Sequence, residues 1–264
     1  MRVFDFEYDG LYLSDFGFLI CSFDTKGIQT LSGSKITFNT VSINNGEKYE
    51  LINSEYTDCL GATFQICKRT CDGSNSEITL DEFRDLSSWL NRKKYYKFRF
   101  IDNKEYEEIY FEASFNISKI ESDGKLVGLE LEMFTNRPYA LHEPISILFN
   151  NTSTNGTKTI INDSDEEGYI YPSMKITVNQ SGNLIIKNDF ENRTMSVLNC
   201  IQGEIITINY PIIQSSLPTH KIQNDFNWNF FRLCSTLNDK KNNLTISIPC
   251  TIEMFYSPVV KISI

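Results

Sequence analysis

The feature that most constrains the fold is an alternation of apolar and polar residues between positions 96 and 133. It begins in YKFRF and ends in LELEMF, where Glu130 and Glu132 separate apolar neighbours. Successive side chains of a strand point to opposite faces, so this pattern buries one face of a sheet. Within it, ESDGK supplies a tight turn at Asp123-Gly124. The sequence therefore predicts a sheet that contains a long β-hairpin.

One segment before this sheet has the periodicity of a helix instead. Its apolar residues recur three and four positions apart: Leu80, Phe83, Leu86, Trp89 and Leu90. Thr79, followed three positions later by Glu82, forms a capping box that satisfies free N–H groups of the first turn. A single helix with one apolar face is therefore expected to lie on the sheet.

Three further runs before the helix predict strands. They are Leu11–Ile20, Ser34–Ile43 and Gly61–Lys68, and the second is closed by the turn signal NNGE. The first half of the chain is thus expected to be a sheet with one helix packed on it.

The alternation ends at NRPYA. Pro138 removes a ladder donor and favours an extended Arg137, so strand pairing should stop there. Beyond Pro144 the chain reads as short strands with turns every eight to twelve residues, which is typical of a β-sandwich. We therefore predict a mainly β protein with a domain over residues 1–141 and a second over 142–264.

Composition narrows the classes of function. A net charge of −9 repels nucleic-acid phosphates and disfavours a sequence-specific nucleic-acid reader. Acidic residues in MRVFDFEYDG argue against an export signal, and no apolar run is long enough to span or insert into a membrane. Seven irregularly spaced cysteines are expected to remain thiols in a reducing cytoplasm.

Candidate catalytic and metal-binding residues are sparse. Cys59, Cys67 and Cys71 lack a second ligand pair and are interpreted as buried or half-buried thiols. His142 and His220, the only histidines, lie near prolines and are interpreted as surface loop residues. Asp163–Gly168 lacks the ligand spacing of a calcium loop. No catalytic motif or phosphate-binding loop is present, so we expect no catalytic residue, no metal and no cofactor.

An aromatic segment near the C-terminus allows two interpretations. DFNWNFFRL (Asp225–Leu233) places Phe226, Trp228 and Phe230 on one face if it forms a strand. Such rings can stack on sugars where they line a groove. Beside a sandwich core, they more often pack inside, and that interpretation is favoured.

In their order and spacing, several segments over nearly the whole chain resemble the distal tail (Dit) proteins of long, non-contractile-tailed bacteriophages, the siphophages. In the first half they are SDFGFLI, the helix ending in Trp89-Leu90, YKFRF and NRPYA. In the second half they are GYIYP, IQGEIITINY, FNWNFFRL, NNLTIS and MFYSP. The family pattern contains no catalytic residues, so none is assigned here.

This resemblance implies a virion structural protein at the distal end of the tail, assembled in the bacterial host cytoplasm. An N-terminal belt domain, a β-sandwich with one helix and a β-hairpin, would close a homohexameric ring around a channel for DNA. A C-terminal galectin-like β-sandwich would project outward. The ring would connect the tail tube and tape-measure proteins to the tail-tip or tail-associated lysin protein in a baseplate for host attachment. Receptor-binding proteins could dock around it, although the second half lacks a long insertion that would form a docking arm.

Two other classes stay open. The first is a carbohydrate-binding module that recognises the host cell surface, which requires an exposed aromatic groove. The second is a hydrolase of wall polymers, which requires two carboxylates about 5 to 9.5 Å apart across a cleft.

Overall fold

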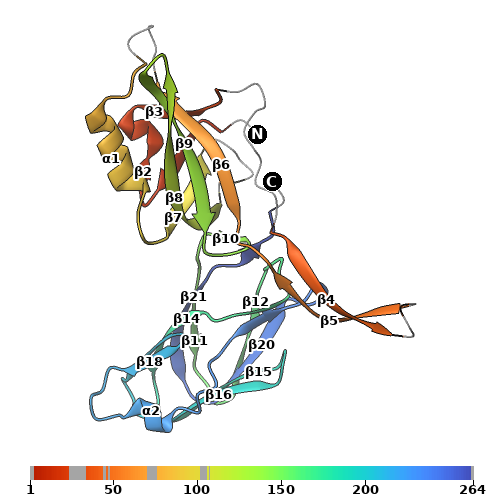
Figure 1. Ribbon diagram of the computed structural model, residues 1–264. Coiled ribbons are helices and arrows are strands. Elements are labelled where there is room, and N and C mark those ends of the chain that lie inside the picture. Colours follow the sequence, from red (N-terminus) through yellow and green to blue (C-terminus); the bar gives the residue numbers. More distant parts are fainter. Residues whose placement is uncertain are drawn as a thin grey trace. The chain divides into compact units, whose positions relative to one another are not determined.

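The computed structural model describes residues 3–23, 34–43, 46, 48–69, 76–101, 106 and 108–262. It forms two compact units (Figure 1). The N-terminal unit comprises Met1–Leu141 with Lys261–Ile264, and the C-terminal unit comprises His142–Val260. Both are built mainly of strands, which confirms the predicted fold class.

The N-terminal unit is organised around one antiparallel sheet in the order β2-β1-β7-β8-β9-β6-β3. A backbone bond from Ile20 N to the Phe4 carbonyl (2.9 Å) links the two ends of this order, so the sheet curls back on itself. In chain order, the strands are β1 (Asp5–Tyr8), β2 (Leu11–Tyr12), β3 (Phe18–Cys21), β6 (Gly61–Lys68), β7 (Tyr96–Ile101), β8 (Ile109–Ser122) and β9 (Lys125–Thr135), and the short β10 (Ala140–His142) pairs with β8.

The predicted strand over Leu11–Ile20 is wrong in its middle. A short 3-10 helix, η1 (Leu13–Phe16), separates β2 from β3. Gly17 ends it in the left-handed region with φ 78°, where glycine meets no Cβ penalty. This helical turn places Leu13 in the core. It also lets the Phe16 ring stack on Trp89, with 4.5 Å between the ring centroids.

Aromatic rings fill the core of the N-terminal unit. Phe6 lies among them, with Phe98 at 5.3 Å, Trp89 at 5.7 Å and Phe64 at 5.8 Å between ring centroids. The alternation in the sequence explains this arrangement, because every second residue of β1, β7 and β8 faces the same interior.

The β8–β9 hairpin turns where the sequence predicts. Asp123 (φ 52°) and Gly124 (φ 76°) are both left-handed, and Ser122 pairs with Lys125 across the turn. A two-residue turn with positive φ at both positions matches the right-handed twist of the strands it joins.

Helix α1 (Leu80–Leu90) begins at the predicted cap. The Glu82 N–H donates to Thr79 Oγ1 (3.3 Å), and the Thr79 N–H donates to Glu82 Oε2 (2.8 Å). Leu86, Trp89 and Leu90 are buried, so the apolar face of the helix packs onto the unit.

Replacing Thr79 with alanine is expected to lower the stability of the N-terminal unit by about 1 kcal/mol, because it removes the Oγ1 that accepts from the Glu82 N–H and donates to Glu82 Oε2. The backbone N–H of residue 79 still donates to Glu82. Hydrogen exchange of the first helical turn would measure the loss. Ser88→Ala at an exposed mid-helix position should leave exchange unchanged or slow it. Equal exchange in the two variants would contradict the role of the cap.

The C-terminal unit is a sandwich of two main sheets. One has the order β11-β21-β14-β17-β18 and the other β12-β20-β15-β16, while β13 and β19 pair separately. The strands are β11 (Ile145–Asn151), β12 (Gly156–Ile161), β13 (Gly168–Ile170), β14 (Ser173–Val178), β15 (Gly182–Asn188), β16 (Arg193–Cys200), β17 (Ile205–Asn209), β18 (Ile212–Ser215), β19 (Leu233–Ser235), β20 (Lys241–Ile246), β21 (Cys250–Tyr256) and β22 (Val259–Val260), and the one-turn helix α2 spans Ile222–Asp225.

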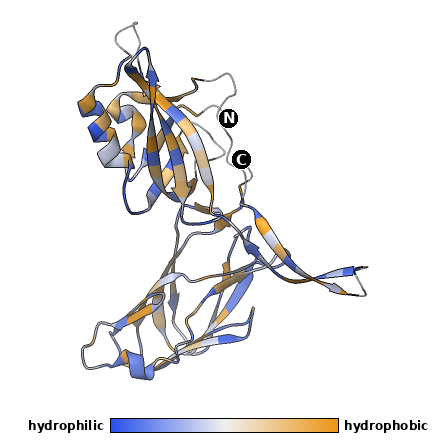
Figure 2. Ribbon diagram, viewed as in Figure 1, coloured by the Kyte–Doolittle hydropathy of each residue, from blue (hydrophilic) through white to orange (hydrophobic). Residues whose placement is uncertain are grey.

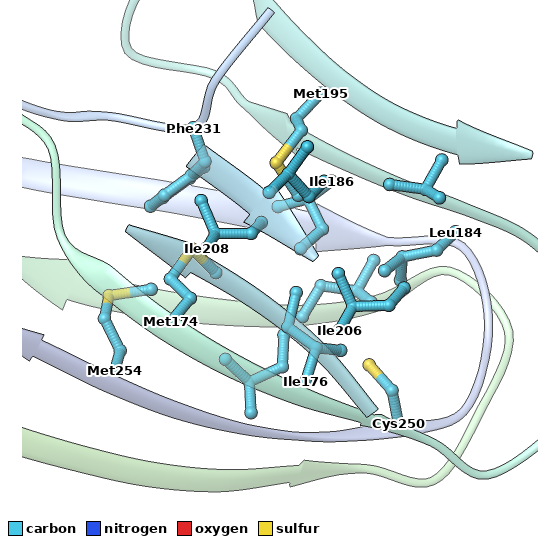
Figure 3. Packing of buried hydrophobic residues seen from close by; sticks show 14 of the residues in the cluster. Met174, Ile176, Leu184, Ile186, Met195, Ile206, Ile208, Phe231, Cys250 and Met254 are labelled. Carbon is cyan, nitrogen blue, oxygen red and sulfur yellow. The ribbon is translucent and has the colours of Figure 1, made fainter. Parts of the chain in front are cut away.

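Aliphatic and sulfur-containing side chains fill the space between these sheets (Figure 3). Met174, Ile176 and Ile206 come from one sheet, and Ile186 and Met195 come from the other. Each alternates with an exposed or half-exposed neighbour, as a sandwich strand requires.

Candidate assembly interface

A β-hairpin outside the main sheet is the most exposed element of the N-terminal unit. It consists of β4 (Ile36–Ile43) and β5 (Lys48–Tyr56), which pair only with each other and extend away from that sheet (Figure 1). The sequence predicts β4 and its turn; β5 was missed, although the Asn45-Gly46 dipeptide is a strong hairpin signal.

The two faces of this hairpin differ in polarity. Phe38 pairs with Ser54, and Thr40 pairs with Leu51, so register places Phe38 and Leu51 on the same face. The apolar face carries Ile36, Phe38, Tyr49, Leu51 and Tyr56 beside Thr40, Ser42 and Ser54, and the opposite face carries Thr37, Asn39, Lys48, Glu50, Asn53 and Glu55 beside Val41 and Ile43. Ile52 is the extra residue where the register shifts, and it is also exposed.

The apolar face of the hairpin is open to solvent. Phe38 is 62% exposed and Leu51 is 56% exposed, and hydrophobic positions occur along the ribbon (Figure 2). On the polar face, Asn39 donates to Asn53 Oδ1 (2.7 Å), and Lys48 pairs with Glu50 (3.0 Å). A two-stranded ribbon is marginally stable by itself, and a contiguous exposed apolar patch marks an interaction site.

The base of the hairpin is attached to the end of the N-terminal unit. Ser34 Oγ donates to the Pro138 carbonyl (2.8 Å), and the Tyr56 ring meets Tyr139 edge to face at 6.5 Å. These contacts fix the origin of the hairpin and leave its apolar face free along most of its length.

The same unit also has an incompletely paired strand. β9 pairs with β6 along Gly61–Cys67, whereas β3 covers only Gln65–Lys68 on the other side. Among the described residues, no strand pairs with that second edge over residues 61–64. Beside this stretch lies a surface cavity of about 440 Å³, lined by residues 58–63 and by Glu132–Thr135. An unpaired edge is a template for strand addition.

The predicted thiols are not brought together as a metal site. Cys59 is exposed, which contradicts its interpretation as a buried thiol, and Cys67 is half-buried on β6. Cys71 lies outside the described residues. Within the described ranges, no group of three or more His, Cys, Asp or Glu side chains is placed to hold a metal ion.

The interpretation of both histidines as surface loop residues is wrong. His142 lies at the end of β10, and its N–H donates to the Pro258 carbonyl (2.9 Å). His220 lies in a loop, but its side chain is only 4% exposed. Its Nδ1 lies 2.6 Å from Glu204 Oε1, and its Nε2 lies 3.1 Å from Asp225 Oδ2. Sequence distance hides this cluster, because Glu204, which lies immediately before β17, is sixteen residues away from His220.

The aromatic segment is also different from its prediction. Residues 226–232 form no strand. Phe226 alone among them makes an isolated β-bridge, to Val197. Phe226 and Phe230 are buried in the core, whereas Trp228 is 58% exposed with φ 57°. The three rings therefore do not share one buried face. A left-handed backbone at Trp228 breaks the alternation that the sequence suggests.

No helix among the described residues has the length and apolarity needed to cross a lipid bilayer. Three surface features are candidates for function: the apolar face of the hairpin, the partly unpaired β6 edge and the exposed rings of the C-terminal unit.

Comparisons with known families agree with the two-unit organisation. Residues 1–137 match a family described as the phage tail protein N-terminal domain, and residues 139–256 match one described as the phage tail C-terminal domain. No curated protein sequence matches the chain.

A solved structure shares the fold. The crystal structure of the Dit protein of SPP1, described as a paradigm of the hub adsorption apparatus in phages that infect Gram-positive bacteria, superposes with a TM-score of 0.66. The match covers 97% of this chain and 99% of that one, at 14% sequence identity. The predicted resemblance to distal tail proteins is confirmed at the level of the fold.

Proposed function

This chain belongs to a family of phage tail proteins, and from that premise we propose that it is the hub at the distal end of a long, non-contractile tail. Six copies form a ring through their N-terminal units. The ring connects the tail tube to the tail-tip or lysin protein and lets DNA pass through its centre. Its role is structural rather than catalytic.

The apolar face of the β4–β5 hairpin is the observation that carries this proposal. A protein that works alone rarely keeps Phe38, Leu51 and Ile52 in water along a projecting ribbon. Packing this face against a second copy buries it and stabilises a hairpin that is marginal by itself. The fold shared with a hub protein supports the same assembly.

Ring closure requires two different surfaces on each copy. The apolar hairpin face and the β6 edge at residues 61–64 are two such surfaces of the N-terminal unit. If the hairpin of one copy lies along this edge of the next, the contact is heterologous, and repeated heterologous contacts generate a closed ring when the rotation permits. The cavity beside the edge, with the exposed Phe134 in its lining, leaves room for a side chain of the incoming hairpin.

The overall charge suits a passage for DNA. At a net charge of −9 per copy, a ring repels phosphates and does not retain the nucleic acid that crosses it. We propose the tail tube, tape-measure and tail-tip proteins as neighbours, with receptor-binding proteins docked at the periphery. Assembly takes place in the host cytoplasm, and the mature location is the distal tail of the virion.

The test adds the same charge to opposite faces of the hairpin. Phe38→Asp with Leu51→Asp places two carboxylates on the apolar face, and Ile43→Asp with Asn53→Asp places two on the polar face. On the polar face, the carboxylate at position 43 would lie opposite Lys48, and the one at position 53 would still accept from Asn39. Native mass spectrometry and light scattering of the full chain should show hexamers for the wild type. The first variant should be monomeric, because its buried carboxylates would lack partners in the ring.

The polar-face variant is the matched control, and we expect it to remain hexameric. Circular dichroism should show that both variants stay folded, since neither change touches a core. A wild-type chain that stays monomeric at all concentrations and shows no ring in assembled particles would contradict the proposal. If both variants assembled equally well, the apolar face of the hairpin would not be part of the ring interface.

A further inference from the structure

Trp228 is held in water by a costly local geometry. Its φ of 57° lies in the left-handed region, which is unfavourable for a bulky residue and uncommon outside turns and functional sites. Both flanking residues fix it there: Asn227 Nδ2 and Asn229 Nδ2 donate to the Thr194 carbonyl at 3.0 and 2.7 Å. Asn227 Oδ1 also accepts from Ser196 N (3.1 Å). A strained backbone that exposes the largest apolar side chain indicates a ligand rather than packing.

The exposed indole is part of a connected set of rings. Phe230, which is buried, lies 6.4 Å from Trp228 and 5.2 Å from Tyr210 between centroids. Tyr210 stacks on Tyr171 at 3.9 Å with parallel planes, and Tyr171 meets Tyr169 at 5.4 Å. Trp228, Tyr210 and Tyr169 are each more than half exposed, and the rings between them form a rigid base.

A fixed pair of charges borders this aromatic surface. The Arg232 guanidinium lies 3.8 Å from the Tyr169 ring centroid and donates through two nitrogens to Glu191. The bond from Arg232 holds the pKa of the Glu191 carboxyl below its usual value, so the pair stays ionised at neutral pH. The surface therefore offers flat apolar faces beside an oriented donor and acceptor, a combination that suits ring-shaped molecules carrying hydroxyl groups.

The size of the surface favours a small ligand over a protein. A Tyr or Trp side chain buries about 150–250 Å², so three half-exposed rings supply roughly 300 Å². A stable protein interface buries about 800 Å² on each partner. Two or three sugar rings need no more area than these side chains provide.

We propose that Trp228, Tyr210 and Tyr169 form a saccharide-binding platform on the C-terminal unit, whose ligand is a pyranose polysaccharide of the kind found on cell surfaces. The C–H faces of the sugar rings stack on the exposed aromatic rings, and hydroxyl groups bond to the Arg232–Glu191 pair. The platform does not depend on ring assembly, because every residue in it belongs to the C-terminal unit.

A glycan array of glucose, galactose and N-acetylglucosamine oligosaccharides, probed with the full chain, identifies the ligand class. Titration calorimetry with the strongest oligosaccharide then compares variants. Trp228→Ala should weaken binding at least tenfold, and Trp228→Phe, which keeps a ring, should lose less. Leu237→Ala, at the most exposed apolar side chain of the same unit, should bind like the wild type. Ligand should also protect Trp228 from acrylamide quenching.

Two results would overturn this proposal. One is an array with no bound oligosaccharide; the other is binding that Trp228→Ala leaves unchanged. If Trp228→Ala instead removed another tail protein from assembled particles while no oligosaccharide bound, the rings would be a protein-docking surface. Hexamer formation measured on the same samples separates a failure here from a failure of the proposed hub role.

Discussion

Replacing Glu204 with glutamine is expected to lower the free energy of unfolding of the C-terminal unit by about 3 kcal/mol at neutral pH. The Glu204 side chain is fully buried and accepts three hydrogen bonds. The donors are Ser215 Oγ (2.5 Å), the Ile201 N–H (3.0 Å) and His220 Nδ1 (2.6 Å). Glutamine keeps one acceptor but turns an amide N–H₂ toward a donor, and it leaves His220 with one carboxylate instead of two.

The loss of unfolding free energy caused by Glu204→Gln depends on pH, and the direction of this dependence follows from the pKa of Glu204. Burial raises the pKa of the Glu204 carboxyl, but bonds from Ser215, the Ile201 N–H and His220 outweigh it, and the net pKa is lowered. A depressed folded-state pKa contributes stability above the unfolded pKa, about 4.3, and this contribution disappears as pH falls through the folded value. The difference in unfolding free energy between the wild type and Glu204→Gln should therefore be largest near neutral pH and become smaller below about pH 4.

Urea unfolding followed by hydrogen exchange of peptides from β17 and α2 would measure this change, because it reports the C-terminal unit separately. Glu253→Gln is the control. Glu253 pairs with Lys175 at 3.7 Å on the surface, so its loss should cost less than about 1 kcal/mol. A Glu204→Gln chain as stable as the wild type at neutral pH would show that the buried carboxylate contributes nothing.

Local signals in the sequence were sufficient for helix α1 and for the strands of the β8–β9 hairpin. The cap at Thr79, the turn at Asp123-Gly124 and the period of two along β9 all depend on neighbouring residues, and the structure confirms each of them. Hairpin β4–β5 was predicted only as far as its turn. Its exposed apolar face mimics a half-buried strand, because a residue pattern cannot tell a face covered by the same chain from one covered by another copy.

The parts that were missed depend on contacts between distant residues. His220 reads as a polar loop residue until the start of β17 brings Glu204 against its ring. Trp228 alternates with Phe226 and Phe230, which predicts a shared face. Side-chain bonds from Asn227 and Asn229 to Thr194, more than thirty residues away, instead hold the backbone left-handed and turn the indole outward. Helix and strand propensities and the spacing of apolar residues take no account of hydrogen bonds between distant side chains.

Replacing Trp89 with alanine is expected to destabilise the N-terminal unit by about 4 kcal/mol. The indole is buried, stacks on Phe16 at 4.5 Å and on Phe6 at 5.7 Å, and donates from Nε1 to the Tyr8 carbonyl (3.0 Å). Alanine removes the ring contacts between α1, η1 and β1, and it leaves a buried carbonyl without this donor.

The conservative change separates the two contributions of Trp89. Trp89→Phe keeps a ring against Phe6 and Phe16 but lacks the N–H, so it should lose roughly 1–2 kcal/mol. Hydrogen exchange of peptides from β8 would report the N-terminal unit, and peptides from β14 serve as an internal control that should not change. Hexamer formation should fail in Trp89→Ala above its lowered melting temperature, because the hairpin is attached to this unit. Equal losses of stability in the two variants would mean that the hydrogen bond from Nε1 to the Tyr8 carbonyl provides the stabilisation. Unchanged exchange of the β8 peptides would show that the packing of helix α1 does not stabilise the sheet.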